Sequence, residues 1–286
     1  MNLENPNLIK ACMFDMDGTI TDKGMHYPSQ EMADALTNLA QKMPIAICTG
    51  RQLESFESHG LNYLLKEIQP KKLERFLENL YLVAENGSIG YNFNTDLDRF
   101  QEFYRGQWPE EIIERNNFMK QLDEEVSEFG EVVYEAHRVV VVVRTFHGED
   151  NDIDKIYNRS AEIESIVKSF LSEHWSNFEE FFHIGNAGIG VVVCPADSDK
   201  DRGIKEFGDI LTKSRGYEFS KNYREILVIG DNPQIRGNDH YFLAGKYGIP
   251  FSVGDHVLNA SPVKEKNGNR LLHSAGTLAL IREILQ

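Results

Sequence analysis

The amino-acid sequence predicts an α/β protein with a three-layer core around a parallel β-sheet and an α+β domain inserted into that core. Three observations support this prediction. Short apolar runs alternate with helix-type patterns over the first ninety residues, as in consecutive βαβ units. The pattern then changes to long β-branched runs and amphipathic stretches. The first pattern returns after residue 200, so the core is interrupted and then completed.

The first part of the chain is predicted to contain three strands separated by helices. The strands are the apolar runs at residues 10–14, 44–48 and 81–84. Between the first two strands, apolar residues at 32–43 recur every three or four positions, which is the period of an amphipathic helix. A charged helical stretch at 61–80, interrupted at Pro70, connects the second and third strands.

The middle of the chain is predicted to form the inserted domain, at residues 91–190. After a polar, aromatic stretch come a helix at 110–129, a β-branched run at 132–146, a long amphipathic helix at 153–171, and two strands with a Gly/Asn turn at 178–195. The core then comprises residues 1–90 and 191–286, with linkers near 89–92 and 186–198.

The last part of the chain is predicted to complete the core. A helix near 202–212 precedes an apolar run at 226–229, and further helices follow near 240–247 and at 278–285. The apolar run is short and ends in Gly230 and Asp231, which matches the ends of the earlier strands.

Composition narrows the function classes. The 286 residues carry a formal charge of −15, from 30 basic and 45 acidic residues. That excess argues against nucleic acid or an anionic membrane as the main partner, because both bind basic surfaces. The longest apolar runs are about five residues, against about 20 for a membrane span. Cys12, Cys48 and Cys194 lie in apolar runs, typical of buried thiols in a reducing compartment. We therefore expect a cytoplasmic protein, and no secretory signal is recognised.

Polar residues follow three of the predicted strands. Asp15 and Asp17 follow the first, Thr49 the second, and Asp231 the last apolar run. An acidic residue after a strand often belongs to a turn or a helix cap. In an open parallel sheet, however, ligands bind at the carboxyl ends of the strands. Three such ends in one sheet favour a shared site, and their oxygen atoms suit Mg²⁺ better than zinc.

These residues resemble the motifs of haloacid dehalogenase-superfamily phosphatases. The stretch FDMDGTIT is similar to the first motif, DxDGT after a buried strand. The other matches are Thr49 in CTGR, Lys200 in DSDKDRGIKEF, and Asp231 with Asn238 and Asp239 in the pattern GD…ND. The insert lies where a C2-type cap would be, and ENG at residues 85–87 is similar to the Cof-like branch, subclass IIB. The resemblance implies a Rossmann-like core.

The resemblance also implies roles for individual residues. Asp15 is expected to attack phosphorus and form an aspartyl-phosphate. Asp17 is expected to protonate the leaving oxygen and then activate water. Thr49 is expected to bind a phosphoryl oxygen, and Lys200 to hold Asp15 and neutralise developing charge. The residues expected to contact substrate are Gly50, Arg51 and Asn86.

A magnesium ion is implied at the same place. Its expected ligands are the Asp15 carboxylate, the Asp17 carbonyl and Asp231. Asn238 and Asp239 are expected to support these ligands, and the six-residue spacing between the GD and ND pairs leaves open whether either of them touches the ion.

Two alternatives to a phosphatase remain open. Six residues, NPQIRG, separate the GD and ND pairs, and this longer spacing resembles eukaryotic-type phosphomannomutases, as does the Asp199–Lys200 pair. The chain lacks a segment like their NxSPxGR motif and carries TGR, which they normally lack. We therefore predict a Mg²⁺-dependent phosphatase of a small phosphorylated metabolite, a sugar phosphate by resemblance. The alternatives are a phosphosugar mutase and a non-catalytic phosphate-binding protein of the same fold.

Overall fold

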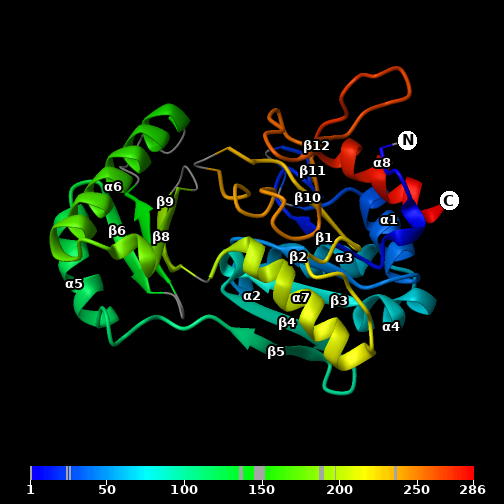
Figure 1. Cartoon of the computed structure of the whole chain (residues 1–286), viewed down its shortest axis with the longest axis horizontal. Coiled ribbons are helices and arrows are strands. Elements are labelled where there is room, and N and C mark those ends of the chain that lie inside the picture. The colour runs from blue at the N-terminus through cyan, green and yellow to red at the C-terminus, as the bar shows by residue number, and fades with distance from the viewer. Residues whose placement is uncertain are drawn as a thin grey trace. The chain divides into compact units, whose positions relative to one another are not determined.

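The computed structural model describes residues 2–23, 25, 27–134, 138–144, 152–186, 190–196, 198–234 and 237–286. The chain divides into two compact units (Figure 1). The core unit comprises Met1–Arg105, Lys200–Ile235 and Asp239–Gln286, and the inserted unit comprises Gly106–Asp199 and Arg236–Asn238.

An eight-stranded sheet forms the centre of the core unit, in the order β12-β11-β10-β1-β2-β3-β4-β5. The strands are β1 (Ala11–Asp15), β2 (Ile45–Cys48), β3 (Leu80–Ala84), β4 (Ile89–Asn94), β5 (Arg99–Arg105), β10 (Ile226–Gly230), β11 (Ile249–Ser252) and β12 (Ser261–Pro262). In this order, the first six strands, from β12 through β1 to β3, are parallel to one another. Strand β4 pairs antiparallel with β3, and β5 pairs antiparallel with β4. The chain proceeds from β1 to β2 and β3 on one side, and to β10 and β11 on the other. The strand order therefore reverses beside β1, and such a switch point opens a crevice for ligands.

The register of the parallel strands brings their carboxyl ends level. Asp15 lies opposite Cys48 in β2, and Phe14 lies opposite Ile229 in β10. The residues that face Asp15 are Cys48 in β2 and Gly230 in β10. Thr49 and Asp231 therefore each lie one residue beyond the residue that faces Asp15. The paired strands thus place the polar residues after β1, β2 and β10 at one edge of the sheet.

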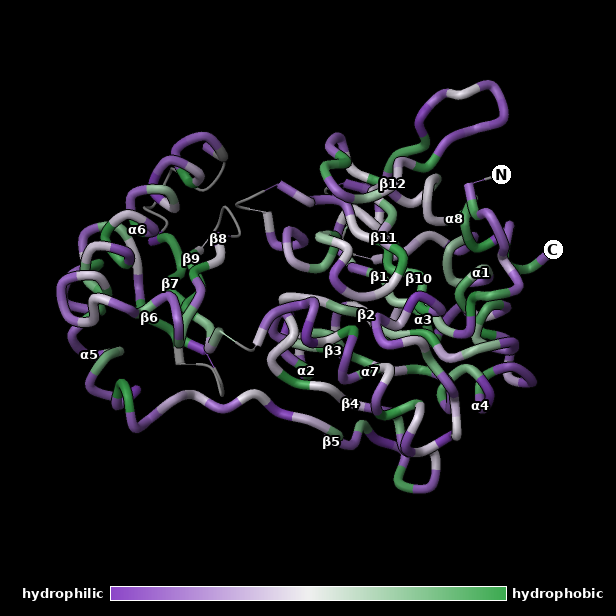
Figure 2. Tube along the Cα trace, viewed as in Figure 1, coloured by the Kyte–Doolittle hydropathy of each residue, from purple (hydrophilic) through white to green (hydrophobic). Residues whose placement is uncertain are grey.

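Helices cover both faces of this sheet. They are η1 (Pro6–Leu8), α1 (Gln30–Ala40), α2 (Leu53–Phe56), η2 (Glu57–Leu61), α3 (Asn62–Glu67), α4 (Pro70–Glu78), η3 (Glu85–Gly87), α7 (Lys200–Arg215) and α8 (His273–Leu285). Alternate side chains of β1 point to opposite faces: Cys12 and Phe14 join the core cluster with α1 and α8, whereas Met13 joins the cluster with α7. Figure 2 shows the central strands β1, β3 and β10 as mainly hydrophobic. This arrangement confirms the predicted three-layer α/β core.

The inserted unit has its own sheet and core. Four antiparallel strands lie in the order β6-β7-β9-β8. Its elements are α5 (Arg115–Val126), β6 (Gly130–Tyr134), β7 (Val139–Val143), α6 (Ile153–His174), η4 (Phe178–Glu180), β8 (Phe182–Asn186) and β9 (Gly190–Pro195). Valines of β7 and β9 pack with α5 and α6 in a separate apolar cluster. Residues 135–137, 145–146 and 187–189 of the predicted strands and turn lie outside the described residues.

The boundary of the inserted unit differs from the predicted one. The polar, aromatic residues 91–105 are predicted to belong to the insert, but they form most of β4 and all of β5 of the core sheet. The rings of Phe93 and Phe100 lie 5.3 Å apart, and Phe100 is buried in the core cluster. At the other end, β9 belongs to the inserted sheet, so the unit extends to Asp199 rather than to residue 190.

The helix predicted near residues 240–247 is wrong, because this segment forms turns. Two features of this segment prevent a helix. Asp239 directs its carboxylate into the interior, where Lys200 and backbone amides bind it. Gly245 and Gly248 then adopt φ values of +79° and +69°, which interrupt a right-handed helix.

None of the described helices is long and apolar enough to cross a membrane. Cys12, Cys48 and Cys194 are buried, and no disulfide joins them.

Candidate active site

Asp15 ends the central strand and is almost fully buried, with 2 % of its surface exposed. Its Oδ1 accepts a hydrogen bond from Lys200 Nζ at 2.6 Å. Its Oδ2 is buried and has no hydrogen-bond partner among the residues that the structure describes. Burial raises the pKa of Asp15 well above its usual value, the charge of Asp239 raises it further, and Lys200 opposes both effects. A buried carboxylate oxygen without a donor is available to bind a cation, a water or a ligand group.

Lys200 lies at the start of α7, also with 2 % exposure. Its Nζ donates to Asp15 and, at the same distance of 2.6 Å, to Asp239 Oδ1. It also lies 5.5 Å from the centre of the Phe242 ring. Burial alone lowers the pKa of this amine, but the two carboxylates outweigh burial and raise the pKa well above its usual value. Lys200 is therefore a charged ammonium that joins two acidic side chains.

Asp239 supports the loop after β10. Its Oδ2 accepts from the backbone amides of Asp231 at 2.9 Å and Asn232 at 3.1 Å, while its Oδ1 accepts from Lys200. Both oxygens therefore already have donors. The backbone comes so close that a Cβ on Gly230 would lie 2.7 Å from Asp239 Oδ2. Asp239 thus fixes the position from which Asp231 projects.

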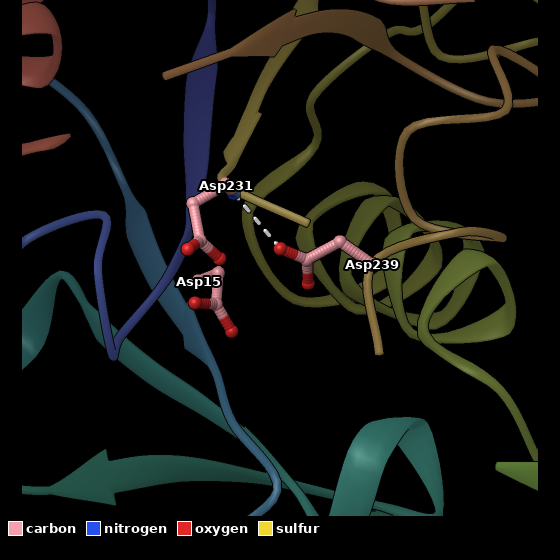
Figure 3. A group of neighbouring side chains, drawn as sticks. All are labelled: Asp15, Asp231 and Asp239. Atoms are coloured by element: carbon pink, nitrogen blue, oxygen red, sulfur yellow. Dashed lines mark hydrogen bonds between the residues drawn. The ribbon is translucent and has the colours of Figure 1, made fainter. Parts of the chain in front are cut away.

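The carboxylates of Asp15, Asp231 and Asp239 form one cluster (Figure 3). One oxygen from each lies within 4.8 Å of the others. Burial and the charge of Asp239 raise the pKa of Asp231 to about 7. Fully ionised, three carboxylates and the Lys200 ammonium leave a net charge of −2. An all-oxygen donor set with this charge fits a hard divalent cation such as Mg²⁺.

Asp17 is not one of the three clustered carboxylates, and it pairs with Arg51. Arg51 Nη2 donates to Asp17 Oδ1 at 2.6 Å, and the Asp17 side chain is 53 % exposed. Arg51 also donates through Nη1 to the carbonyl oxygen of His59 at 3.3 Å. The side chain of Arg51 therefore orients the carboxylate of Asp17 rather than pointing into solvent.

The loops after β2 and β3 lie side by side. The backbone amide of Asn86 donates to the Thr49 carbonyl oxygen at 3.0 Å, and the backbone amide of Glu85 donates to the Arg51 carbonyl oxygen at 3.1 Å. Asn86 adopts φ +54°, and a Cβ on Gly50 would lie 3.1 Å from Asn86 Oδ1. This oxygen is buried and has no hydrogen-bond partner among the described residues. The predicted substrate-contact residues are thus brought together.

The predicted pair of Asn238 and Asp239 is divided. Asp239 is fully buried in the acidic cluster, whereas Asn238 is exposed. The longer segment between Asp231 and Asp239 did not prevent the second acidic residue from returning to the first.

The residues that hold the loop after β1, apart from Gly18, are not predicted from the sequence. Gly18 has φ +77°, and a Cβ there would lie 2.5 Å from Asp231 Oδ2. His273 Nδ1 lies 2.9 Å from the Gly18 carbonyl oxygen, and Thr277 Oγ1 donates to the Thr19 carbonyl at 2.8 Å. Only Gly18 carried a signal in the sequence, as the glycine of the first motif.

Comparison with known proteins gives a consistent picture. Residues 12–233 match the family described as haloacid dehalogenase-like hydrolase. A solved Plasmodium falciparum IMP-nucleotidase with IMP bound is 15 % identical, with a TM-score of 0.64, over 97 % of this chain and 68 % of that one. A haloacid dehalogenase-like hydrolase from Bacteroides thetaiotaomicron is 14 % identical, with a TM-score of 0.60, over 96 % and 99 %. The C-terminal domain of C. albicans trehalose-6-phosphate phosphatase is 14 % identical, with a TM-score of 0.60, over 99 % and 97 %. At these identities the likeness shows a shared fold. No curated protein matches the sequence significantly.

Proposed function

Since the chain belongs to the haloacid dehalogenase-like hydrolases, we propose that it is a phosphatase acting on a small phosphorylated metabolite. The observation that carries this proposal is the buried Asp15 carboxylate, with one oxygen bound by Lys200 and the other without a donor among the described residues. The fold shared with an IMP-nucleotidase and a trehalose-6-phosphate phosphatase supports this substrate class. Within it, we propose a sugar phosphate.

The side chains can divide the reaction into two steps. In the first, an Asp15 carboxylate oxygen attacks phosphorus, the bond to the leaving oxygen breaks, and Asp17 gives its proton to that oxygen. In the second, water attacks the aspartyl-phosphate, passes a proton to Asp17, and the bond between Asp15 and phosphorus breaks to release phosphate. Lys200 stabilises negative charge on Asp15, and the Thr49 hydroxyl binds a phosphoryl oxygen.

A divalent cation completes the proposal. Asp15 and Asp231 would hold Mg²⁺ together with the carbonyl oxygen of Asp17, while Asp239 supports Asp231. When bound, the ion neutralises charge on the carboxylates and on the phosphoryl group. Hydrolysis needs such help, because the fully ionised cluster, with its net charge of −2, would otherwise repel a dianionic ester.

We also propose that the inserted unit is the C2-type cap and that its residues select the alcohol part of the substrate. Its position in the chain, between the second and third motifs, supports this assignment.

The cytoplasmic location inferred from the cysteines stays a prediction.

A substrate panel tests the proposed function. The purified protein is incubated with sugar phosphates, nucleoside monophosphates and an aryl phosphate, with Mg²⁺ or with a chelator. We expect phosphate release with Mg²⁺, fastest from a sugar phosphate, and none with the chelator. Failure to hydrolyse any ester with Mg²⁺ would contradict the proposal.

The same panel separates the alternatives. A hexose 1-phosphate supplied with a hexose bisphosphate should yield free phosphate if the protein is a phosphatase. Isomerised hexose phosphate would instead identify a mutase. Joint binding of Mg²⁺ and a metal-fluoride phosphate mimic, without turnover of any ester, would identify a non-catalytic protein.

The acidic cluster predicts that Mg²⁺ stabilises the protein more at pH 8 than at pH 6. The pKa of Asp231 rises from an unfolded value of about 3.9 to about 7 in the fold. Between these values the metal-free fold binds more protons than the unfolded chain, so its unfolding free energy falls as pH rises. The raised pKa of Asp15 acts in the same direction. A bound cation replaces the protons and removes the penalty.

Thermal unfolding with and without Mg²⁺ checks this expectation. The metal-free midpoint should fall by a few degrees from pH 6 to pH 8, since about 1 kcal/mol corresponds to roughly 2–4 °C in a chain of this size. The gain from Mg²⁺ should grow over the same interval. Asp231→Asn, which cannot titrate, should flatten both trends. A Mg²⁺ gain equal at the two pH values would count against a cation at this cluster.

A further inference from the structure

The first turn of α8 binds the loop that follows β1, although 255 positions separate His273 from Gly18. His273 Nδ1 lies 2.9 Å from the Gly18 carbonyl oxygen. A carbonyl oxygen can only accept, so Nδ1 carries the proton and donates it. The backbone amide of His273 donates in turn to the Val253 carbonyl at 2.7 Å, and the amide of Val253 donates to the carbonyl of Gly230 at 2.9 Å. One residue thus connects the loop after β1 with the end of β10.

His273 makes these contacts from an unfavourable backbone conformation. Its φ is +50°, in the left-handed region that residues other than glycine adopt uncommonly, although His, like Asn and Asp, occurs there more often than other residues. It stands at the first position of α8, and no side chain among the described residues caps this helix. A residue held in this conformation is retained only when its surroundings fix it, and such residues cluster at functional sites. Glycine would fit the backbone better but would lack the ring.

The Gly18 peptide is in direct contact with the acidic cluster. A Cβ on Gly18 would lie 2.5 Å from Asp231 Oδ2 and 3.0 Å from its carboxyl carbon. The amide of Gly18 donates to Thr21 Oγ1 at 3.1 Å. Gly18 is therefore held at its backbone amide by Thr21 and at its carbonyl oxygen by His273, with the Asp231 carboxylate against its Cα.

We propose that His273 is a positioning residue for the cation site: its Nδ1–H fixes the Gly18 peptide against Asp231 and so sets the distance from Asp231 to Asp15. This inference rests on the proposed function, because it concerns the ligands of the same cation. A purely structural role is the competing explanation. Two other hydrogen bonds also join α8 to this loop: Thr277 Oγ1 donates to the Thr19 carbonyl oxygen, and Ser274 Oγ donates to Asp22 Oδ1. These bonds keep the loop attached to α8 when the ring is absent, so loss of the ring acts locally.

Three variants of the full chain test the proposal. His273→Gly relieves the backbone but removes the donor. His273→Asn also tolerates a positive φ, and its Nδ2 can donate from nearly the place of Nδ1. The matched control is Leu258→Gly, because Leu258 shares a positive φ, at +40°, but is exposed.

Mg²⁺ binding is measured by calorimetry, and unfolding midpoints are measured without metal. We expect His273→Gly to bind Mg²⁺ about threefold to tenfold more weakly, the scale of one hydrogen bond, with an unchanged or higher midpoint. His273→Asn should recover most of the affinity, and Leu258→Gly should keep all of it. Unchanged Mg²⁺ affinity in His273→Gly would overturn the inference, and so would a loss that Asn does not recover.

Hydrogen exchange of the metal-free protein provides a readout independent of the cation. Deuterium uptake in a peptide covering residues 16–22 should rise in His273→Gly and stay unchanged in Leu258→Gly. Equal uptake in wild type and His273→Gly would overturn the inference. If the wild-type protein binds Mg²⁺ and hydrolyses an ester, such a result refutes the role of His273 alone. Absence of Mg²⁺ binding and hydrolysis in the wild type refutes the proposed function itself.

Discussion

Replacing Asp15 with asparagine should lower the rate of phosphate-ester hydrolysis by about 10⁴-fold or more, the scale expected when a nucleophile that acts with its partners is removed. Asparagine has nearly the same shape, and its Oδ1 can still accept from Lys200. It is neutral, however, and does not form an acyl phosphate with the ester. The change therefore removes the reacting atom and keeps the surrounding geometry.

The same substitution should leave the fold intact. Burial raises the pKa of Asp15, which means that the ionised carboxylate is unfavourable in the metal-free site. A neutral amide avoids this penalty, so we expect the metal-free unfolding midpoint at pH 8 to equal or exceed that of the wild type. Steady-state hydrolysis and thermal unfolding measured on one preparation check both expectations.

Asp34→Asn is a suitable control, because Asp34 is exposed on α1. It should retain wild-type activity. Hydrolysis by Asp15→Asn within tenfold of the wild-type rate would exclude Asp15 as the nucleophile. Loss of both activity and folded structure would leave the role to be read from Asp15→Glu, whose longer side chain keeps the charge but displaces the attacking oxygen.

The parallel core sheet and the meeting of polar residues at one of its edges could be predicted because both follow from local patterns. Each buried strand ends in a polar residue, and parallel pairing makes those ends level. The register that sets Asp15 against Cys48 is enough to bring Thr49 beside it. Lys200, at the start of the helix that follows the insert, is the predicted site residue that comes from a helix rather than from the end of a strand.

Other features depend on contacts that no local pattern reports. Strands β4 and β5 present polar side chains along an edge of the sheet, so their residue pattern resembles that of the insert rather than that of a core strand. The segment after Asp239 shows helical spacing, but the interior binding of that carboxylate prevails over helix propensity. His273 reaches Gly18 across nearly the whole chain, and a histidine at the start of a helix carries no distinguishing signal.

Replacing Lys200 with methionine should destabilise the metal-free protein by about 3–5 kcal/mol, the usual result of removing one partner from a buried ion pair. Methionine keeps the length and apolar stem of lysine and its contact with Phe242, but two buried carboxylates lose their shared ammonium. Hydrolysis should fall about 10²–10³-fold, as when one donor to developing charge is removed.

The stability loss should be larger at pH 8 than at pH 6. Lys200 lowers the pKa of Asp15 in the wild type, so its removal raises that pKa further. The folded variant then holds extra protons that the unfolded chain has released, and its unfolding free energy falls as pH rises through the folded pKa. Lower pH supplies the missing positive charge as protons and restores part of the stability.

Lys205→Met provides the matched comparison on the same helix. Lys205 forms an ion pair with Asp209 at 2.5 Å, but its side chain is 36 % exposed and that of Asp209 is 44 % exposed. Such surface pairs contribute about 0–1 kcal/mol, so Lys205→Met should lose little stability and no activity. Denaturant unfolding at both pH values separates the two variants. A loss in Lys200→Met no greater than in Lys205→Met, or one independent of pH, would show that the buried ammonium does not hold the acidic cluster together.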